Sequence, residues 1–362
     1  MNFDRSRLMD LLIKASRTFA LNIPLLPAPL MDAMTVGYLL MRNADTIEDA
    51  YRWPRERRIR ELENFIEVVT HYDNRRLAES FAARFAGGMT GTLTPSAIPA
   101  EVENAGHLEV LRETPYVMDI LNALPEEYIP VVVEHVKRVA RRMITWVENH
   151  DEQNRLSLRR IQQLDEYCYS VAGIVGEMIT SLIAIYAPGI GRRRLLYLRT
   201  LETAFGAGLQ LTNIIKDVFR DHGEGRHYIP EEFLPLGPDE GLERISPMFT
   251  YAYRHLSQGI DYVMALPLDE LGIRKFCLVP LLLAAATLVR LQEHTEELFS
   301  GSDVKISREV VMELVMATER AVSDNLQVRG LWEQVTRPLA MLKEAYALRE
   351  EPGFPAADFQ RI

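Results

Sequence analysis

The sequence has little cysteine: Cys168 and Cys277 are the only two among 362 residues. Both lie in apolar stretches, where a thiol usually packs as a small hydrophobic side chain. Two such residues exclude the disulfide framework that is typical of small secreted domains. The N-terminal segment has an acidic residue early and no sustained apolar run, so no secretory signal is predicted. These absences favour a protein of the reducing cytoplasm.

Surplus positive charge is also absent. The chain carries 41 Lys and Arg against 51 Asp and Glu, which gives a net charge of −10. Proteins that bind nucleic acid hold its phosphates with clustered basic residues, so nucleic acid is not an expected partner. An anionic small substrate is compatible with this balance, provided that bound metal ions supply local positive charge.

Long hydrophobic runs are missing as well. The longest apolar run, residues 276–289, has 14 residues, which is too short to span a bilayer and indicates a buried helix. The tail, about residues 350–362, contains no hydrophobic anchor. We therefore predict a cytoplasmic protein without a transmembrane anchor, whose membrane contact is at most peripheral.

Helical periodicity is abundant. Apolar residues recur at three- and four-residue spacing, and alternating runs flanked by Asn-Gly or Asp-Gly turns are absent. The pattern therefore predicts an all-α fold. Long stretches of this kind are residues 126–150, 161–187, 192–221 and 306–349.

Glycine and proline accumulate in two segments, about residues 87–100 and 222–240. Segments of this composition form loops, which in compact domains often act as lids or binding segments. The central helices follow one another without an obvious boundary. We therefore predict one domain over residues 1–362, with flexible loops at these two places and a tail at about 350–362.

Two polar stripes interrupt otherwise apolar helices. The members of each stripe share a sector of roughly 80° on one helix face. A polar stripe on a helix whose other faces are apolar indicates a site inside the protein. The first stripe consists of Tyr38, Arg42, Asp45, Asp49 and Arg52, and the second of Gln210, Asn213, Asp217 and Asp221.

Each stripe contains an Asp-x-x-x-Asp pair. Carboxylates one helical turn apart repel each other, unless a hard cation such as Mg²⁺ lies between them. A single such pair arises easily by chance and usually marks a solvated helix face. Two pairs, each with further polar residues in phase, favour a metal site that holds a diphosphate.

These motifs resemble those of the squalene and phytoene synthase family, over about residues 14–310. The first stripe and the second stripe are similar to its two aspartate-rich motifs. Three further blocks are similar to its N-terminal signature, its central helix and the flap after its second motif. They are Ser16-Arg-Thr-Phe19, Asp165-Glu-Tyr167-Cys-Tyr-Ser-Val-Ala-Gly-Ile-Val-Gly176 and Gly225-Arg226-His-Tyr228-Ile-Pro230.

The resemblance implies an isoprenoid-synthase-type helical bundle around a central cavity. It implies Mg²⁺-dependent joining of two farnesyl diphosphates, 1′–1, through a cyclopropyl diphosphate intermediate. The implied metal ligands are Asp45, Asp49, Asn213, Asp217 and Asp221. The implied substrate contacts are Ser16, Arg17, Thr18, Tyr38, Arg42, Gln210, Asn213, Lys216, Arg226 and Tyr228. Lys216 departs from the usual arginine of the family and loses its bidentate fork.

The central block carries the implied catalytic tyrosine, Tyr167, which would aid ionisation and proton removal. The alternative is a packed core tyrosine with a satisfied hydroxyl. The small residues of this block, which include Gly173 and Gly176, would leave room for a farnesyl chain. Helix–helix packing explains them equally well, and both explanations can hold.

A block at residues 275–288 is similar to that of the squalene synthase branch of the family, as is Val304-Lys305-Ile306. This likeness implies reduction of the intermediate by NADPH, with Phe276 and Lys305 at the cofactor. The alternative within the family omits the reduction and makes dehydrosqualene, hydroxysqualene or phytoene. An alternative of another class is a catalytically silent helical partner or a prenyl-chain carrier, but that would not require four intact aspartates.

Overall fold

The computed structural model of the protein describes most of the chain. The described residues are 4–16, 18–51, 53–85, 105–234, 241–295, 298 and 304–346. The predicted loop at 87–100, the tail at 350–362, the candidate substrate residue Arg17 and Arg52 of the first stripe lie outside them.

The chain divides into two compact units. Unit 1 comprises Met1–Asn154 and Ser181–Pro188, and unit 2 comprises Arg155–Thr180 and Gly189–Ile362. That they form one domain over residues 1–362 stays a prediction, and so does the central cavity.

Unit 1 is built from helices, as the all-α prediction requires. They are α1 (Arg5–Ala15), α2 (Phe19–Asn22), the 3₁₀ turn η1 (Ile23–Leu25), α3 (Leu30–Glu48), α4 (Arg55–Thr70), α5 (Arg75–Ala83), α6 (Ala105–Arg112), α7 (Thr114–Ala123) and α8 (Ile129–Glu148). Side-chain caps set two of their starts. The Asp4 carboxylate accepts from the first backbone N–H groups of α1, and the Asn74 side chain accepts from the backbone of α5.

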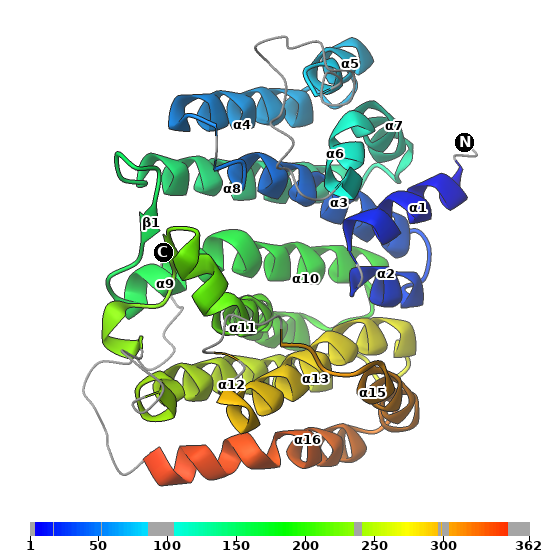
Figure 1. Ribbon diagram of the computed structural model, residues 1–362. Helices are drawn as coiled ribbons and strands as arrows, with labels where there is room; N and C mark the ends of the chain where they lie inside the picture. Colours follow the sequence, from blue (N-terminus) through cyan, green and yellow to red (C-terminus); the bar gives the residue numbers. More distant parts are fainter. Residues whose placement is uncertain are drawn as a thin grey trace. The chain divides into compact units, whose positions relative to one another are not determined.

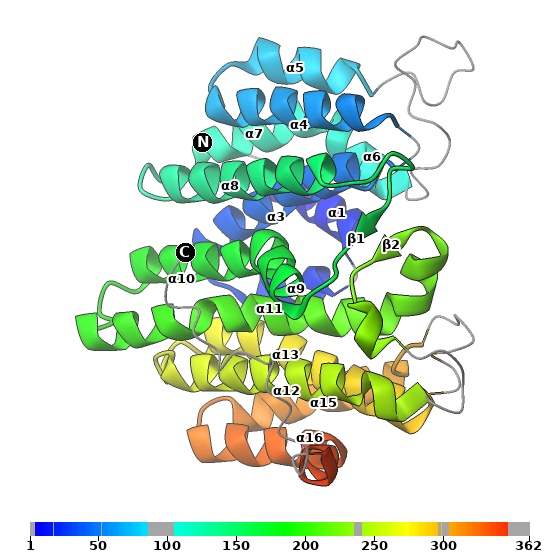
Figure 2. The same ribbon diagram turned by 90° about the vertical axis from the view of Figure 1, so that its left-hand side faces the viewer.

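The helix that carries the first stripe, α3, lies at the centre of unit 1, because it contacts α1, α4, α6, α7 and α8. In Figure 2, α4 lies along α8. Leu39, Ala44 and Ile47 bury the apolar faces of α3, and burial of this kind stabilises by about 25 cal/mol per Å². The buried Asn43 amide nitrogen is paired, because it donates to the Thr114 hydroxyl at 3.1 Å.

Unit 2 is also predominantly helical. Its elements are β1 (Leu156–Ser157), α9 (Ile161–Cys168), the π-helix η3 (Tyr169–Gly173), the start of α10 (Ile174–Tyr186), α11 (Arg192–Gly223), β2 (Arg226–His227), the 3₁₀ turn η4 (Glu231–Phe233), α12 (Gly241–Ala265), α13 (Leu271–Glu293), α15 (Arg308–Ala321) and α16 (Asn325–Tyr346). The described part of the periodic stretch 306–349 therefore forms two helices, α15 and α16, which a turn separates.

The longest helix of unit 2, α11, carries the second stripe. It contacts α12, α13, α9 and η3, and Figure 1 shows α12 and α13 side by side. Close backbone approach explains the small residues around η3. A Cβ atom on Gly176 would lie 2.0 Å from the backbone oxygen of Glu202, and one on Gly206 equally close to that of Ala172. Helix packing therefore accounts for these glycines.

The predicted loop at 222–240 is partly regular. The helix α11 continues to Gly223, and β2 pairs in parallel with β1, so that Arg226 lies opposite Leu156. The backbone N–H of Leu158 donates to the carbonyl of His227 at 2.8 Å. This short pairing fixes the segment that follows the second stripe. Residues 235–240 lie outside the described residues.

Two stretches, Ile161–Tyr186 and Leu271–Glu293, are long and apolar enough to cross a membrane by length and composition. The second contains the apolar run that the sequence assigned to a buried helix. More than half of the apolar window in each is buried inside the structure, as in a core helix. They are a weak sign of membrane association.

Candidate active site

The first stripe forms a chain of polar contacts in unit 1. The Arg42 guanidinium donates to the Tyr38 hydroxyl at 3.0 Å and pairs with the Asp45 carboxylate at 3.2 Å. The Tyr38 hydroxyl in turn donates to the backbone carbonyl of Ala15 at 3.3 Å. Helical spacing produces the first two contacts, because residues three and four apart share a helix face.

The charge of Asp45 is only partly compensated. Burial raises the pKa of this carboxyl to about 6, against the opposing effect of Arg42, and the like charge of Asp49 adds to the rise. Asp49 follows the last residue of α3 and is exposed. The pKa of Arg42 is also raised, because Asp45 and Tyr38 outweigh its burial. A cation beside the two carboxylates would favour their charged forms.

The predicted N-terminal signature lies next to this stripe. Ser16 ends α1 with an extended backbone, and its hydroxyl accepts from the backbone N–H of Phe19 at 3.0 Å. The Phe19 ring packs on Tyr38, with ring centroids 5.0 Å apart. Thr18 is exposed. The structure therefore brings Ser16 close to Tyr38 and Arg42, through Ala15.

His107, on α6, belongs to the same cluster, and sequence reasoning missed it. Its ring hydrogen-bonds to the backbone of Ala15, where the Tyr38 hydroxyl also donates. Burial and the nearby Arg42 charge lower the pKa of His107 to about 4, although the bond to Ala15 opposes them. The imidazole is therefore neutral near pH 7. A lone histidine in a short helix carries no spacing signal that could have identified it.

The second stripe lies on the last half of α11, in unit 2. Gln210 is half-buried and Asn213 is exposed. Asp217 pairs with Lys216 at 3.4 Å and with Arg220 at 3.0 Å. The predicted substrate residue Lys216 thus neutralises a predicted metal ligand.

Asp221 is buried and pairs with Arg226, which lies on β2, at 2.5 Å. Burial raises the pKa of Asp221, although the Arg226 charge lowers it. Arg226 also pairs with Glu224 at 2.5 Å. Between Glu224 and Arg226, Gly225 has a φ of +81°, which favours glycine at this turn between α11 and β2.

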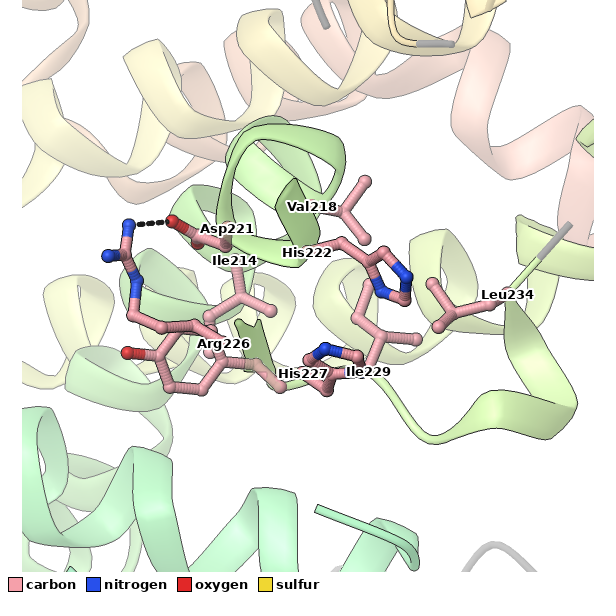
Figure 3. A pocket seen from close by; sticks show the side chains of 9 residues that line it. Ile214, Val218, Asp221, His222, Arg226, His227, Ile229 and Leu234 are labelled. Atoms are coloured by element: carbon pink, nitrogen blue, oxygen red, sulfur yellow. Dashed lines mark hydrogen bonds and ion pairs between the residues drawn. The ribbon is translucent and has the colours of Figure 1, made fainter. Parts of the chain in front are cut away.

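A small pocket opens beside this pair. Figure 3 shows Arg226 reaching toward Asp221, while the rings of His222 and His227 lie together, with centroids 4.1 Å apart. Apolar side chains close the other side. The lining residues are Ile214, Val218, Asp221, His222, Arg226, His227, Tyr228, Ile229 and Leu234.

Tyr167 and Tyr228 form a buried pair. Tyr167 is 5% exposed. Its hydroxyl donates to that of Tyr228 at 3.3 Å, and the ring centroids are 4.8 Å apart. The pairing agrees with a satisfied core tyrosine, and it also places Tyr167 next to a predicted substrate residue. Its catalytic role stays a prediction.

Asp165 supports the helix that carries Tyr167, and sequence reasoning gave it no role of its own. Its carboxylate accepts from the Tyr251 hydroxyl on α12. Burial raises the pKa of Asp165 to about 6, although this hydrogen bond opposes the rise. No spacing rule links two residues 86 positions apart.

The remaining predictions concern the metal and the reductant. Within the described ranges, no three His, Cys, Asp or Glu side chains gather in one group that could hold a metal ion. Each stripe supplies two aspartates, and whether the stripes meet stays a prediction. The predicted cofactor residue Phe276 is 2% exposed, in the core of unit 2, whereas Lys305 is exposed.

The helices and the two stripes define this protein as an all-α chain with the isoprenoid-synthase fold of squalene synthases. The sequence profile described as squalene/phytoene synthase matches residues 12–310. The chain belongs to that family, as its motifs predicted.

Named relatives include squalene synthases of three organisms. That of Schizosaccharomyces pombe is 25% identical over 322 residues, which are 86% of this chain and 64% of that protein. The Saccharomyces cerevisiae protein is 25% identical, with 97% of this chain and 73% of that protein covered. The Homo sapiens protein is 25% identical, with 84% and 67% covered. The chain thus spans about two thirds of the length of these relatives.

Two solved structures share the fold. TcSQS in complex with a ligand matches with a TM-score of 0.70 and 22% identity, over 93% of this chain and 98% of that chain. A dehydrosqualene synthase in complex with a ligand matches with a TM-score of 0.53 and 16% identity, over 87% and 95%. At these identities the likeness shows the fold alone.

Proposed function

We propose that the chain is a prenyltransferase that joins two farnesyl diphosphates 1′–1 into presqualene diphosphate and reduces this intermediate with NADPH to squalene. One observation carries the proposal: each stripe pairs a partly buried aspartate with an arginine, Arg42 with Asp45 and Arg226 with Asp221. Carboxylates bind hard cations and guanidinium groups bind phosphate oxygens, and a metal–diphosphate substrate needs both. Membership of the family supports the same reading.

The aspartates fit Mg²⁺ by the chemistry of their donors. Burial and the neighbouring Asp49 disfavour the charged form of Asp45, and a cation would reverse that preference. We propose Asp45 and Asp49 as ligands in unit 1, and Asn213, Asp217 and Asp221 in unit 2. When bound, Mg²⁺ neutralises charge on the leaving diphosphate as its C–O bond ionises.

Other polar side chains bind and orient the diphosphates in this proposal. The arginines offer a planar fork that matches phosphate oxygens, whereas Lys216 offers a point charge. Ser16 and the tyrosines offer hydroxyl donors. The full proposed set is Ser16, Arg17, Thr18, Tyr38, Arg42, Gln210, Asn213, Lys216, Arg226 and Tyr228.

We propose that Tyr167 handles the proton lost when the cyclopropane ring closes. Its hydroxyl is buried and donates to the Tyr228 hydroxyl, so its orientation is defined. Removal of water around it strengthens its interaction with developing positive charge on the substrate. The Tyr167 oxygen would take up this proton and pass it to the diphosphate that the substrate releases, which is a stronger base than the neutral hydroxyl.

The reductive step rests on the likeness of residues 275–288 and 304–306 to squalene synthases. Phe276, on α13, is buried and would shape the wall of the NADPH pocket. The exposed Lys305 would attract the phosphates of NADPH. We propose both as cofactor residues in these two different senses.

Product analysis tests the proposal. The purified chain is incubated with farnesyl diphosphate and Mg²⁺, with and without NADPH, and the hydrocarbon product is identified by mass. Squalene formed only with NADPH is the expected result. A product that NADPH does not change would replace squalene synthesis by dehydrosqualene, hydroxysqualene or phytoene synthesis. No condensation product at all would favour a silent partner or a carrier.

We propose a cytoplasmic location with peripheral membrane contact. The two stretches that are apolar enough to span a bilayer are mostly buried inside the structure, which supports a role in the core. Fractionation of the native host, with a salt wash of its membranes, tests this location. Retention in the membrane after the wash would contradict peripheral contact.

A further inference from the structure

The first two turns of α11 expose apolar and basic side chains together. Leu196 is 56% exposed and Tyr197 is 51% exposed, although side chains of this kind are usually buried. Four exposed arginines flank them. The α11 basic face, as we name it, consists of Arg192, Arg193, Arg194, Leu196, Tyr197 and Arg199.

Helical geometry places basic and apolar side chains next to each other on the surface of α11. At about 100° per residue, Arg192 and Leu196 lie about 40° apart around the helix, and so do Arg193 and Tyr197. Leu198 lies on the opposite side and is buried. In Figure 2, the green N-terminal end of α11 extends past the ends of α12 and α13, its neighbours in unit 2.

The charge of this segment is opposite to that of the whole chain. Residues 188–201 contain four arginines and no Asp or Glu, whereas the chain has a net charge of −10. Across the described parts of the chain, no carboxylate pairs with the arginines at 192–194. Arg199 approaches Glu202 at 3.7 Å. Ion pairing among the described residues therefore does not account for the cluster.

We propose that the α11 basic face docks the protein on the surface of an anionic phospholipid bilayer. The exposed arginines, which spread around the first two turns of α11, attract anionic lipid headgroups, and the attraction falls off within a Debye length. Leu196 would enter the boundary between headgroups and acyl chains, where Tyr197 is also favoured. A free phosphate would need only the arginines and would leave both apolar side chains in water.

The benefit of docking rests on the proposed function. The prenyl chains of the substrate and the hydrocarbon product both partition into a bilayer. A protein held at the surface would therefore take up and release them without passage through water. The binding itself depends on charge and exposed apolar area, and not on turnover.

Vesicle co-sedimentation tests the proposal with the full chain. We expect binding to phosphatidylcholine vesicles that contain phosphatidylglycerol, weak binding to pure phosphatidylcholine, and loss of binding at high salt. Replacement of three arginines, Arg192→Gln, Arg193→Gln and Arg194→Gln, should weaken binding on the order of 100-fold. Leu196→Ser with Tyr197→Ser should weaken it on the order of 10-fold.

Matched controls distinguish the effect of the α11 basic face from the effects of net charge and of exposed apolar area elsewhere. The triple change Arg308→Gln, Arg320→Gln and Arg337→Gln removes the same charge from exposed positions of α15 and α16, and should leave binding nearly unchanged. Met312→Ser with Met316→Ser removes exposed apolar side chains of α15, which are 57% and 49% exposed. Equal losses in these controls would overturn the proposal, and so would binding that ignores the lipid charge.

Turnover in solution distinguishes this proposal from the proposed function. The triple variant at 192–194 should retain condensation of farnesyl diphosphate in vesicle-free buffer. If the wild type turned over substrate but did not bind vesicles, only the docking proposal would be refuted. Vesicle binding without turnover would refute the enzymatic proposal and leave docking intact. If the wild-type protein bound neither kind of vesicle, docking on a bilayer would be refuted, and an acidic protein would become the favoured partner of this face.

Discussion

The two stripes obtain their arginines in different ways. In unit 1, Arg42 and Asp45 lie three residues apart on α3, so the helix itself sets their 3.2 Å contact. In unit 2, Asp221 lies near the end of α11, and Arg226 reaches it from β2, after the chain turns at Gly225. The first pair therefore depends on helical periodicity, and the second depends on a turn and a strand pairing.

This difference has a consequence for robustness. A change outside α3 leaves the spacing of Arg42 and Asp45 intact. The contact between Asp221 and Arg226 depends on the conformation of the turn. A larger residue at Gly225 would disturb that turn, because a Cβ atom there would lie 2.9 Å from the Arg155 side chain. We expect the second stripe to be the more sensitive to changes in neighbouring segments.

The largest expected effect tests whether both stripes take part in one reaction. Asp45→Asn and Asp217→Asn, made separately, should each lower turnover of farnesyl diphosphate by about 1,000-fold, because each removes charge that holds the metal. Product formation at saturating Mg²⁺ is the measurement, and Asp73→Asn, in an exposed turn, is the control. Near-normal turnover in either variant would remove that stripe from the metal site.

A smaller loss is expected for the tyrosine pair of unit 2. Tyr167→Phe keeps the ring and removes only the hydroxyl, so kcat should fall about 100-fold while the thermal unfolding temperature changes little. Tyr228→Phe should act mainly on KM, as expected for a substrate contact. Steady-state kinetics with both variants measure kcat and KM. Equal kcat in Tyr167→Phe and wild type would leave Tyr167 as a packing residue.

Loss of the long-range arginine should destabilise unit 2. Arg226→Gln leaves the buried Asp221 carboxylate without its cation, which should lower the free energy of unfolding by about 2 kcal/mol. Urea unfolding without added metal is the measurement. Glu224→Gln, at the exposed partner of the same arginine, should change stability by less than about 0.5 kcal/mol. Similar losses in the two variants would contradict a special role of the buried pair.

The raised pKa of Asp165 predicts a pH dependence in unit 2. Its folded-state pKa, about 6, exceeds the ordinary 3.8, so the folded protein binds the proton more tightly than the unfolded chain. The stability that it contributes is therefore complete below about pH 3.8 and is lost as pH rises through 6. Asp165→Asn should remove about 1.5 kcal/mol of this decline in the free energy of unfolding. This is half of the energy that corresponds to the full pKa shift, because solvent screens the group. Urea unfolding at pH 4.5 and pH 6.5 measures it. An unchanged slope would contradict the assignment.

The smallest effect is expected for His107, the supporting residue of unit 1. His107→Ala should raise KM for farnesyl diphosphate about five-fold and leave kcat nearly unchanged, because it loosens the Ser16 turn without touching reacting atoms. His107→Asn retains a donor toward the Ala15 carbonyl and should recover most of the loss. Steady-state kinetics decide this, and a fall in kcat without a change in KM would argue against a positioning role.

Sequence reasoning identified the fold class and the family because both depend on local patterns. Helical periodicity predicted the helices that became α8 and α11, and it placed Arg42 and Asp45 on one helix face. It gave no role to His107 or to the contact between Asp165 and Tyr251. These contacts join residues that are far apart in the chain, so no local pattern encodes them. The metal, the reductant and the substrate residues stay predictions, because only activity measurements address them.

The sequence by itself determined that two stripes of carboxylates lie on helices, because the period of an α-helix fixes which side chains share a face. Only the tertiary structure decided which groups surround them. Burial set the raised pKa of Asp45, the β1–β2 pairing brought Arg226 to Asp221, and packing joined Tyr167 to Tyr228. Charge, burial and distance depend on segments that meet only after folding, whereas spacing along one helix does not.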